Sequence, residues 1–270
     1  MAPRRGGHRP KRSLGQNFLV DPNLQRKIVE AVGAGASEEV VEVGPGRGAL
    51  TRHLAGRVGH LVLVELDDDL AGALREEYQG DPRVDVRHAD VLQTDLASCT
   101  RDWAATRVVG NIPYNITTPI LFHLLERPRP RDIVLMVQRE VAERIVAQAG
   151  TSAYGALAVG VQSVADADLL FRVPPQAFRP VPRVESAVVR VTPHRPPGLT
   201  TEDERRLRRL TRAAFHWRRK QMQKILRDHP DLAIPRSVVE AAGAELGLDL
   251  ARRPETFAPD LLVQLAGRLL

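Results

Sequence analysis

Short apolar runs alternate with helical windows along the first half of this 270-residue chain, and this pattern restricts the possible folds more than any other feature. The runs that we expect to be strands occupy residues 40–43, 60–66, 84–88, 107–109 and 133–137. Such alternation is typical of β-α-β units, which place parallel strands side by side in one sheet. Because the runs are almost continuously hydrophobic, both faces of the sheet should be covered. The sequence therefore predicts an α/β domain built on a largely parallel sheet.

The pattern changes after a proline-rich stretch at residues 173–183. One more expected strand occupies residues 186–191, and helical apolar spacing dominates the chain beyond it. Thr201 and Glu204 form a T-x-x-E pattern, which predicts a capping box at the start of a helix. The expected parts are a flexible basic tail at 1–12, an α/β domain at 13–195 and a small all-helical domain at 196–270.

Composition excludes several classes of protein. With 43% hydrophobic residues, a chain of this length can bury a core without cross-links. Cys99 is the single cysteine, which excludes an internal disulfide framework and a zinc site built from several cysteines. The charge-free stretch at 108–125 contains two asparagines and two prolines, so it is not a membrane span. No apolar signal segment follows the basic N-terminus, and we therefore expect a soluble, cytoplasmic protein.

The chain carries 39 Lys and Arg against 33 Asp and Glu, but the basic residues are unevenly distributed. Residues 1–12 contain five of them and residues 205–227 contain ten, with no acidic residue in either stretch. Removing these fifteen from the 39 leaves 24 basic residues against 33 acidic ones. Two basic concentrations on an otherwise acidic body favour a polyanionic partner over ordinary solvated surface.

A glycine-rich turn follows the first expected strand, in residues 40–51 (VVEVGPGRGALT). Gly44 and Gly46 let the backbone turn tightly and approach a ligand without a Cβ in the way. Glu65 ends the next strand, where a carboxylate can accept hydrogen bonds from both hydroxyls of a ribose. Asp90 ends the third strand and is placed to accept from an adenine amino group. NAD and S-adenosylmethionine both carry adenosine, so these residues leave the cofactor open.

The motif Asn-Ile-Pro-Tyr at residues 111–114 follows the fourth expected strand and resolves this ambiguity. It is similar to the Asn/Asp/Ser-Pro-Pro-Tyr/Phe signature of enzymes that methylate amino groups. The exocyclic nitrogen of adenine is a poor nucleophile, because its lone pair is delocalised into the ring. An Asn oxygen and a neighbouring carbonyl can accept its hydrogens and direct the lone pair at a methyl group, while an aromatic ring stacks on the base. Such catalysis depends on positioning and fixed dipoles, so we expect no metal.

Seven blocks of the sequence together resemble the family of ribosomal small-subunit (16S) RNA adenine N6,N6-dimethyltransferases. The blocks lie at residues 13–21, 42–51, 109–125, 136–145, 154–159, 174–189 and 214–226. The resemblance implies a class I Rossmann-like domain that uses S-adenosylmethionine and releases S-adenosylhomocysteine, with a helical C-terminal domain that helps to bind rRNA. It implies dimethylation of N6 in two adjacent adenosines of a hairpin loop near the 3′ end of 16S rRNA, on 30S subunits or their precursors. We also expect a monomer.

The resemblance assigns roles to individual positions. The expected cofactor-binding residues are Asn17, Leu19, Gly44, Gly46, Glu65, Asp90, Val91 and Asn111. Asn111 spans cofactor and substrate, and the carbonyl of Ile112 is the second acceptor for the target amino group. Tyr114 is expected to stack on the target base and Phe178 to cover its other face. The expected phosphate contacts are Arg218, Arg219, Lys220 and Lys224, whose binding should weaken with salt.

Three other interpretations stay open at this point. Macrolide-resistance enzymes that methylate an adenine of 23S rRNA share the Asn-Ile-Pro-Tyr motif, although the block at 214–226 favours the small-subunit enzymes. A non-catalytic rRNA-binding assembly factor on the same fold is the second, but intact Glu65, Asp90, Asn111 and Tyr114 argue against lost activity. A nicotinamide-dependent oxidoreductase is the third, and it rests only on the glycine turn and Glu65.

Overall fold

The computed structural model of the protein describes residues 16–270, so the expected basic tail at 1–12 lies outside the described residues. The chain forms two compact units. The first, here called the α/β unit, contains the described residues up to Ala142 and the segment Asp168–Pro193. The second, here called the helical unit, contains Glu143–Ala167 and His194–Leu270.

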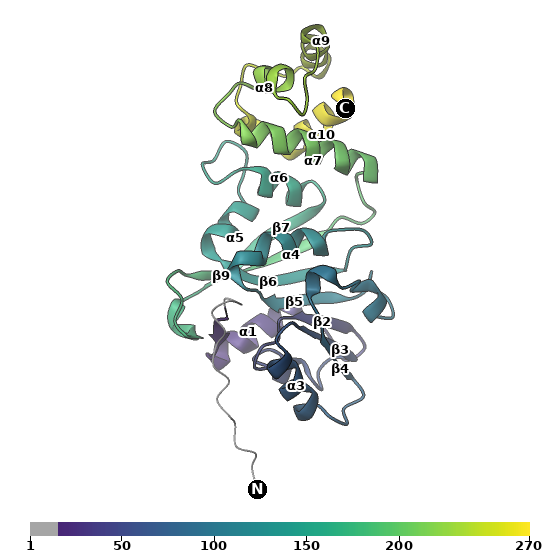
Figure 1. Ribbon diagram of the computed structural model, residues 1–270, viewed down its shortest axis with the longest axis vertical. Helices are drawn as coiled ribbons and strands as arrows, with labels where there is room; N and C mark the ends of the chain where they lie inside the picture. The colour runs from purple at the N-terminus through teal and green to yellow at the C-terminus, as the bar shows by residue number, and fades with distance from the viewer. Residues whose placement is uncertain (1–15) are drawn as a thin grey trace. The chain divides into compact units, whose positions relative to one another are not determined.

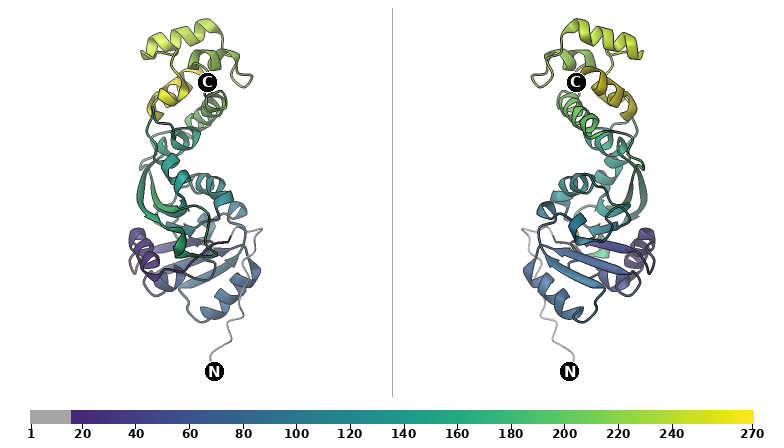
Figure 2. Two further views of the ribbon diagram at one scale, coloured as in Figure 1. Left: turned by 90° about the vertical axis from the view of Figure 1, so that its left-hand side faces the viewer. Right: turned by 90° about the vertical axis from the view of Figure 1, so that its right-hand side faces the viewer.

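A seven-stranded sheet organises the α/β unit, with the strand order β4-β3-β2-β5-β6-β9-β7 among the described residues (Figures 1 and 2). Its strands are β2 (Glu39–Val43), β3 (His60–Glu65), β4 (Val84–His88), β5 (Arg107–Asn111), β6 (Asp132–Gln138), β7 (Ala165–Val173) and β9 (Ser186–Pro193). The pairs that join β4, β3, β2, β5 and β6 are parallel, and β9 pairs with β6 in the antiparallel direction. The expected α/β class is confirmed.

Both faces of the sheet are buried, as the continuous apolar runs predicted. Along β3, Leu61 and Leu63 face one side and Val62 and Val64 the other, and all four are at most 2% exposed. Leu61 and Leu63 belong to a core that also includes Ile28 from the first helix. Strands that are apolar along almost their whole length need helices on both faces of the sheet. The covered sheet then provides a firm support for residues at the carboxyl ends of its strands.

Five α-helices belong wholly or mainly to the α/β unit, namely α1 (Pro22–Val32), α2 (Thr51–Leu54), α3 (Asp68–Glu77), α4 (Thr117–Leu124) and α5 (Arg139–Ile145). Helix α1 begins at Pro22 because the side chain of Asp21 accepts hydrogen bonds from the free backbone N–H groups of Asn23 and Leu24. It contacts β5 and β6, whereas α3 contacts β3 and β4. A separate two-stranded ribbon pairs β1 (Phe18–Leu19) with β8 (Phe178–Arg179), segments that lie far apart in the sequence.

The helical unit is built around one hydrophobic core of its own. Its helices are α6 (Ala156–Gln162), α7 (Thr201–His216), α8 (Met222–Asp228), α9 (Arg236–Leu246) and α10 (Pro259–Leu269). Residues 143–167 were expected in the first domain, but Tyr154 is fully buried in this second core and donates a 2.8 Å hydrogen bond to the carbonyl of Phe257. No helix within residues 16–270 has the length and apolar character that a bilayer crossing requires.

The capping box of α7 lies one residue before its expected position. Thr200, not Thr201, is the N-cap, and its hydroxyl accepts a hydrogen bond from the backbone N–H of Asp203. The Asp203 carboxylate accepts from the backbone N–H of Thr200 in return. The sequence Thr-Thr-Glu-Asp-Glu offers both registers, and the reciprocal bonds form in the first one.

Candidate active site

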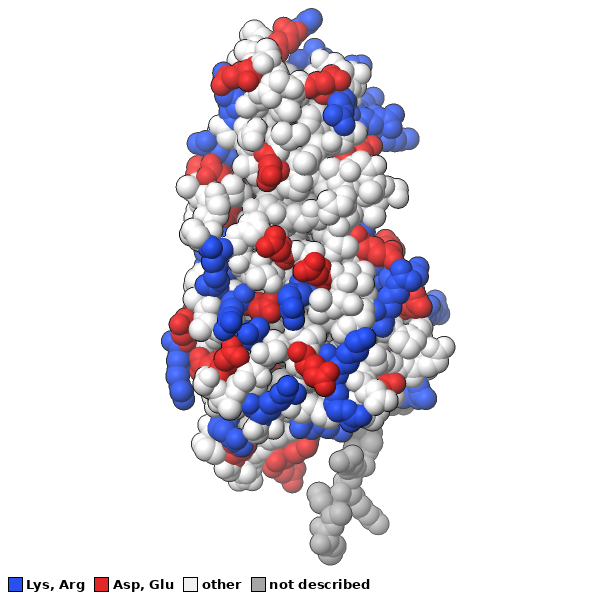
Figure 3. Space-filling view, turned by 180° about the vertical axis from the view of Figure 1, so that it is seen from behind, with Lys and Arg blue, Asp and Glu red and all other residues white. Residues whose placement is uncertain are grey.

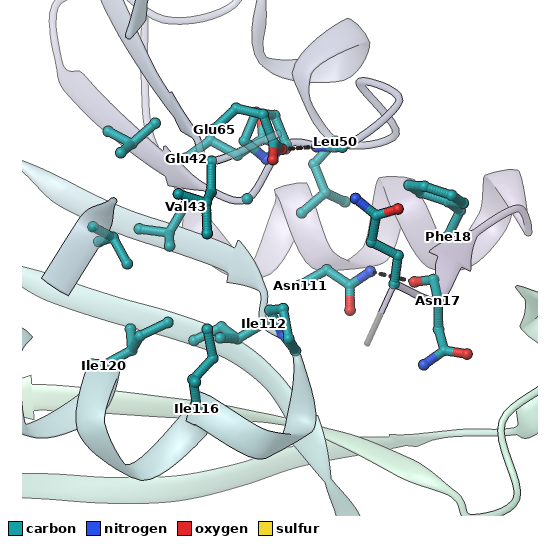
Figure 4. Close-up of a pocket in the computed structure, with 18 of the residues that line it drawn as sticks. Asn17, Phe18, Glu42, Val43, Leu50, Glu65, Asn111, Ile112, Ile116 and Ile120 are labelled. Carbon is teal, nitrogen blue, oxygen red and sulfur yellow. Dashed lines mark hydrogen bonds between the residues drawn. The ribbon is translucent and has the colours of Figure 1, made fainter. Parts of the chain in front are cut away.

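A cavity of about 240 Å³ opens in the α/β unit where β2, β3, β4 and β5 end. The order of the strands reverses between β2 and β5, and ligands of open α/β sheets bind outside the carboxyl ends of the strands at such a switch point. All eight expected cofactor-binding residues line this cavity, and so do Ile112 and Tyr114. In Figure 4, Ile116 and Ile120 lie on one side of the cavity and Asn17 and Phe18 on the other. The structure thus brings together residues spread over about a hundred positions.

The glycine turn after β2 adopts a backbone that other residues disfavour. Gly44 and Gly46 have φ values of 63° and 58°, in the left-handed region. A Cβ on Gly46 would lie only 3.2 Å from the ring of Phe18, and one on Gly44 would lie 3.9 Å from the carbonyl oxygen of Asn111. The turn therefore exposes backbone without side chains to the cavity, between Phe18 and the backbone of Asn111.

Two carboxylates end up buried at the cavity wall. Glu65 is 5% exposed and accepts hydrogen bonds of 2.9 Å from the backbone N–H groups of Gly46 and Asp67. Burial raises its pKa, although those two hydrogen bonds act in the opposite direction. Glu42 accepts a 2.7 Å hydrogen bond from Thr51, and burial raises its pKa to about 8. A cationic ligand in the cavity would lie near both acidic groups and would favour their ionised forms.

Asn111 is fixed by the chain's N-terminal segment. Its Nδ2 donates a 3.0 Å hydrogen bond to the backbone carbonyl of Asn17 (Figure 4). Because a carbonyl can only accept, this contact assigns the nitrogen to that side and turns Oδ1 away from it. No group within residues 16–270 donates a hydrogen bond to Oδ1 of Asn111 or to the carbonyl oxygen of Ile112. Two adjacent residues at the cavity thus carry open acceptors.

Tyr114 lines the cavity beside these acceptors. Its hydroxyl lies 2.7 Å from Oγ of Ser186, a fully buried residue at the start of β9. Burial raises the pKa of the Tyr114 hydroxyl, so the ring stays neutral near physiological pH. The hydrogen bond fixes the far end of the ring of this cavity-lining residue.

Phe178 does not reach the cavity. Its side chain is fully buried in the core of the α/β unit, on β8, where it pairs with Leu19. A stacking role would require the ring to leave this core. In this conformation Phe178 supports the cavity indirectly. Its strand pairs with β1, and β1 carries the cavity residues Phe18 and Leu19.

The expected phosphate contacts follow α7 in the helical unit, and they differ from one another. Arg218 donates a 3.0 Å hydrogen bond to the carbonyl of Ser152 and lies 3.9 Å from the Glu255 carboxylate. Arg219, Lys220 and Lys224 are exposed and make no ion pair with any residue of the described chain. Figure 3 shows basic and acidic side chains interspersed over much of one face of the protein.

Several residues that line the cavity were not predicted individually from the sequence. Glu42 was recognisable only as part of the glycine-turn block, and nothing in the sequence shows that it becomes fully buried. Phe18 lies between two expected residues, and Arg47 stacks over its ring at 4.5 Å. Leu66 follows Glu65, lines the cavity and is 47% exposed. In residues 16–270, no three His, Cys, Asp or Glu side chains converge as metal ligands.

Comparison with known proteins decides the family. A sequence profile described as "Ribosomal RNA adenine dimethylase" matches residues 7–238. The chain belongs to this family. It is therefore an rRNA adenine dimethyltransferase by family, and the α/β fold, the methyltransferase class and the resemblance noted in the sequence are confirmed.

Relatives within and near the family are similar over most of their length. Ribosomal RNA small subunit methyltransferase A of Aromatoleum aromaticum is 45% identical over 249 residues, which cover 92% of this chain and 89% of that one. The protein of the same name from Thiobacillus denitrificans is 46% identical over 220 residues, covering 81% of this chain and 85% of that one. The solved 23S rRNA methyltransferase ErmE superposes with a TM-score of 0.72 at 29% identity, covering 94% and 99%. A dimethyladenosine transferase from Plasmodium falciparum shares the fold, with a TM-score of 0.80 at 24% identity, covering 92% and 95%.

Proposed function

We propose that this protein transfers methyl groups from S-adenosylmethionine to N6 of two adjacent adenosines in a hairpin loop near the 3′ end of 16S rRNA. The substrate would be the 30S subunit or its precursor, in the cytoplasm, and the enzyme would act as a monomer. The observation that carries the proposal is the pair of open acceptors, Asn111 Oδ1 and the Ile112 carbonyl, at one cavity. An amino group that offers two hydrogens fits them.

The cavity fits S-adenosylmethionine on the chemistry of its wall. Bare backbone at Gly44 and Gly46 would receive the amino-acid part of the cofactor, where a Cβ would intrude. Glu65 would accept from the ribose hydroxyls, and Asp90 with Val91 would hold the adenine, since all three residues line the cavity. The carboxyl group of Glu65 at the cavity wall also favours a cationic ligand, because a nearby positive charge stabilises its ionised form.

When bound, S-adenosylmethionine supplies a methyl group already activated on a sulfonium. Asn111 and Ile112 would accept the two hydrogens of the target amino group, so that its lone pair turns out of the ring plane towards the methyl group. Tyr114 would stack on the base and keep it at that angle. These groups act by position and by dipoles fixed before the reaction.

Dimethylation sets a further condition on this arrangement. After the first transfer the target nitrogen has one hydrogen left, so one of the two acceptors must suffice for the second transfer. The apolar side chains of Ile116 and Ile120 line the cavity, and they would tolerate the added methyl group without an unpaired polar atom.

The target adenosine must leave its stack to enter the cavity, at a cost of roughly a few kcal/mol. Unpaired loop adenosines cost less, which suits a hairpin loop. The exposed cations Arg219, Lys220 and Lys224 would hold phosphates elsewhere on the RNA and offset part of this cost.

The test is transfer of labelled methyl groups to undermethylated 30S subunits, with the product nucleosides identified by mass. We expect N6,N6-dimethyladenosine at two adjacent positions near the 3′ end of 16S rRNA. Modification of 23S rRNA instead would contradict the small-subunit assignment and support the 23S-type alternative. Cofactor binding without transfer to either RNA would support a non-catalytic assembly role. Light scattering of the purified protein checks the monomer.

A further inference from the structure

Two exposed apolar side chains, Val181 and Val184, lie in one short loop of the α/β unit. Within residues 16–270 five large apolar side chains are exposed, and three of them are Val20, Val181 and Val184. Val181 is 53% exposed, the largest value of the five. Val181 and Val184 lie in residues 180–185, which connect β8 to β9. Val20 follows β1 and donates its backbone N–H to the carbonyl of Ala177, at the other end of β8 from this loop. Exposure of this kind marks an interaction surface when the side chains are clustered.

Both ends of this loop are attached to residues of the cavity. At its start, Phe178 and Arg179 pair with Leu19 and Phe18, both of which line the cavity. At its end, Ser186 hydrogen bonds the hydroxyl of Tyr114 at 2.7 Å. The loop is therefore continuous with the wall of the cavity at the side where the target base would stack.

The loop also carries positive charge. Arg183 is exposed and has no hydrogen-bond or ion-pair partner in the described part of the chain. The guanidinium of Arg179 donates hydrogen bonds to the carbonyls of Gln176 and Phe178, and it pairs with no carboxylate among residues 16–270. Glu185, the one acid of the loop, pairs with Arg139 at 2.9 Å. The uncompensated charge is thus cationic and lies among valines.

We propose that Val181, Arg183 and Val184 bind the RNA nucleotide next to the adenosine in the cavity. This inference rests on the proposed function and assigns it a further contact surface. When the adenosine leaves its stack, the neighbouring base loses a stacking partner and one of its faces is exposed to water. Val181 and Val184 would cover that face with apolar side chains. The phosphate between the two nucleotides must pass the cavity rim, where Arg183 provides the matching charge.

The experiment compares two variants with two matched controls. Val181→Ser combined with Val184→Ser removes the apolar contact, and Arg183→Ala removes the charge. Val238→Ser, on α9, removes an exposed valine of the helical unit. Arg57→Ala removes an exposed arginine in the turn before β3, at the opposite end of that strand from the cavity.

The probe is an RNA hairpin with two unmethylated adjacent adenosines in its loop, and its binding is measured by fluorescence anisotropy without methyl transfer. We expect about tenfold weaker binding for the double valine variant, with unchanged S-adenosylmethionine binding by calorimetry. Arg183→Ala should lower the slope of log affinity against log salt by about 0.7, the value for one single-strand phosphate. Neither control should change either quantity.

A benzophenone-bearing amino acid in place of Val181 tests the assignment directly. We expect its photocrosslink to map to a nucleotide adjacent to a target adenosine. If the loop variants bind the hairpin like the controls while the wild type methylates it, the inference is overturned and the proposed function stands. If the wild type binds through this loop without methylating, the proposed function fails and the inference stands. A variant that instead converts a dimer to a monomer in light scattering assigns the surface to a second copy of the chain and overturns the RNA proposal.

Discussion

The side-chain amide of Asn111 donates a 3.0 Å hydrogen bond to the backbone carbonyl of Asn17, ninety-four residues earlier in the chain. This bond joins the end of β5 to the segment that leads into β1, and it leaves Oδ1 of Asn111 open. The acceptor that we propose for the target amino group is therefore oriented by the backbone of the N-terminal segment and not by another side chain. Substitution of Asn17 would leave this contact in place, whereas substitution of Asn111 removes it.

Asn111→Ala should strongly reduce the formation of both monomethyladenosine and dimethyladenosine, because we assign to Asn111 the acceptor that orients the nitrogen in each of the two transfers. By comparison with single preorganised groups in other active sites, the rate should fall about a hundredfold to a thousandfold. Single-turnover methyl transfer with mass analysis of the nucleosides measures it. Abundant monomethyladenosine from this variant would contradict the role given to Asn111.

Tyr114→Phe and Tyr114→Ala separate stacking from hydrogen bonding. Phenylalanine keeps the ring, so methyl transfer should fall less than tenfold, while the loss of a partner for buried Ser186 should cost about 1 kcal/mol of folding stability. Alanine removes the stacking surface, and transfer should fall by at least a hundredfold. Urea unfolding and steady-state kinetics on both variants measure these effects, and equal rate losses would refute stacking.

Most of the scaffold could be predicted from the sequence, because continuous apolar runs and the glycine turn have few alternatives. Strand β7 was missed, since Asp166 and Asp168 interrupt its apolar pattern and its burial is only partial. Residues 143–167 belong to the helical unit, because Tyr154 packs in its core and hydrogen bonds Phe257, which lies 103 residues later in the chain. Local patterns carry no information on such distant packing.

The residues of the site could be predicted to a similar extent. The prediction failed for Phe178, whose role depends on the direction in which its ring points. Motifs identified the cavity residues at the ends of β2, β3, β4 and β5, because the carboxyl ends of these parallel strands meet at one edge of the sheet. Asn17 and Leu19 were expected only from the family resemblance. For Phe178 the same stiff proline-rich loop is compatible with a ring that faces the cavity or the core. The pairing of β8 with β1 selects the core, and β1 lies about 160 residues earlier.

Gly46→Ala should weaken both folding and cofactor binding. The backbone at φ 58° is strained for alanine by roughly 1–2 kcal/mol, and its Cβ would press on Phe18 at 3.2 Å. Gly72→Ala is the control, since Gly72 lies within α3 with open space around it. That variant should be neutral or gain up to about 1 kcal/mol. Thermal unfolding with and without S-adenosylmethionine distinguishes the two, and equal behaviour would exclude strain at Gly46.

Glu42 should make stability depend on pH. Its pKa is about 8 in the folded protein against an ordinary value of 4.5, so between these pH values the folded state holds a proton that the unfolded state has released. Stability should therefore fall as the pH rises towards 8, with a limiting slope of roughly 1.4 kcal/mol per pH unit. Glu42→Gln keeps an acceptor for Thr51 but cannot ionise. Relative to the wild type, it should gain at least about 1 kcal/mol between pH 6 and pH 8 in urea unfolding, and a constant difference would show that Glu42 is already ionised at pH 6.

The cations after α7 should separate into a structural residue and RNA-binding residues. Arg218 holds the carbonyl of Ser152, so Arg218→Ala should lower folding stability by about 1 kcal/mol. Lys220→Ala and Lys224→Ala remove exposed, unpaired charges, so they should leave stability unchanged. Each should weaken binding to an RNA hairpin and lower the slope of log affinity against log salt by about 0.7–0.9. Measuring urea unfolding and anisotropy on the same three variants tests this division, and a salt slope that stays constant in both lysine variants would remove them from the RNA contact.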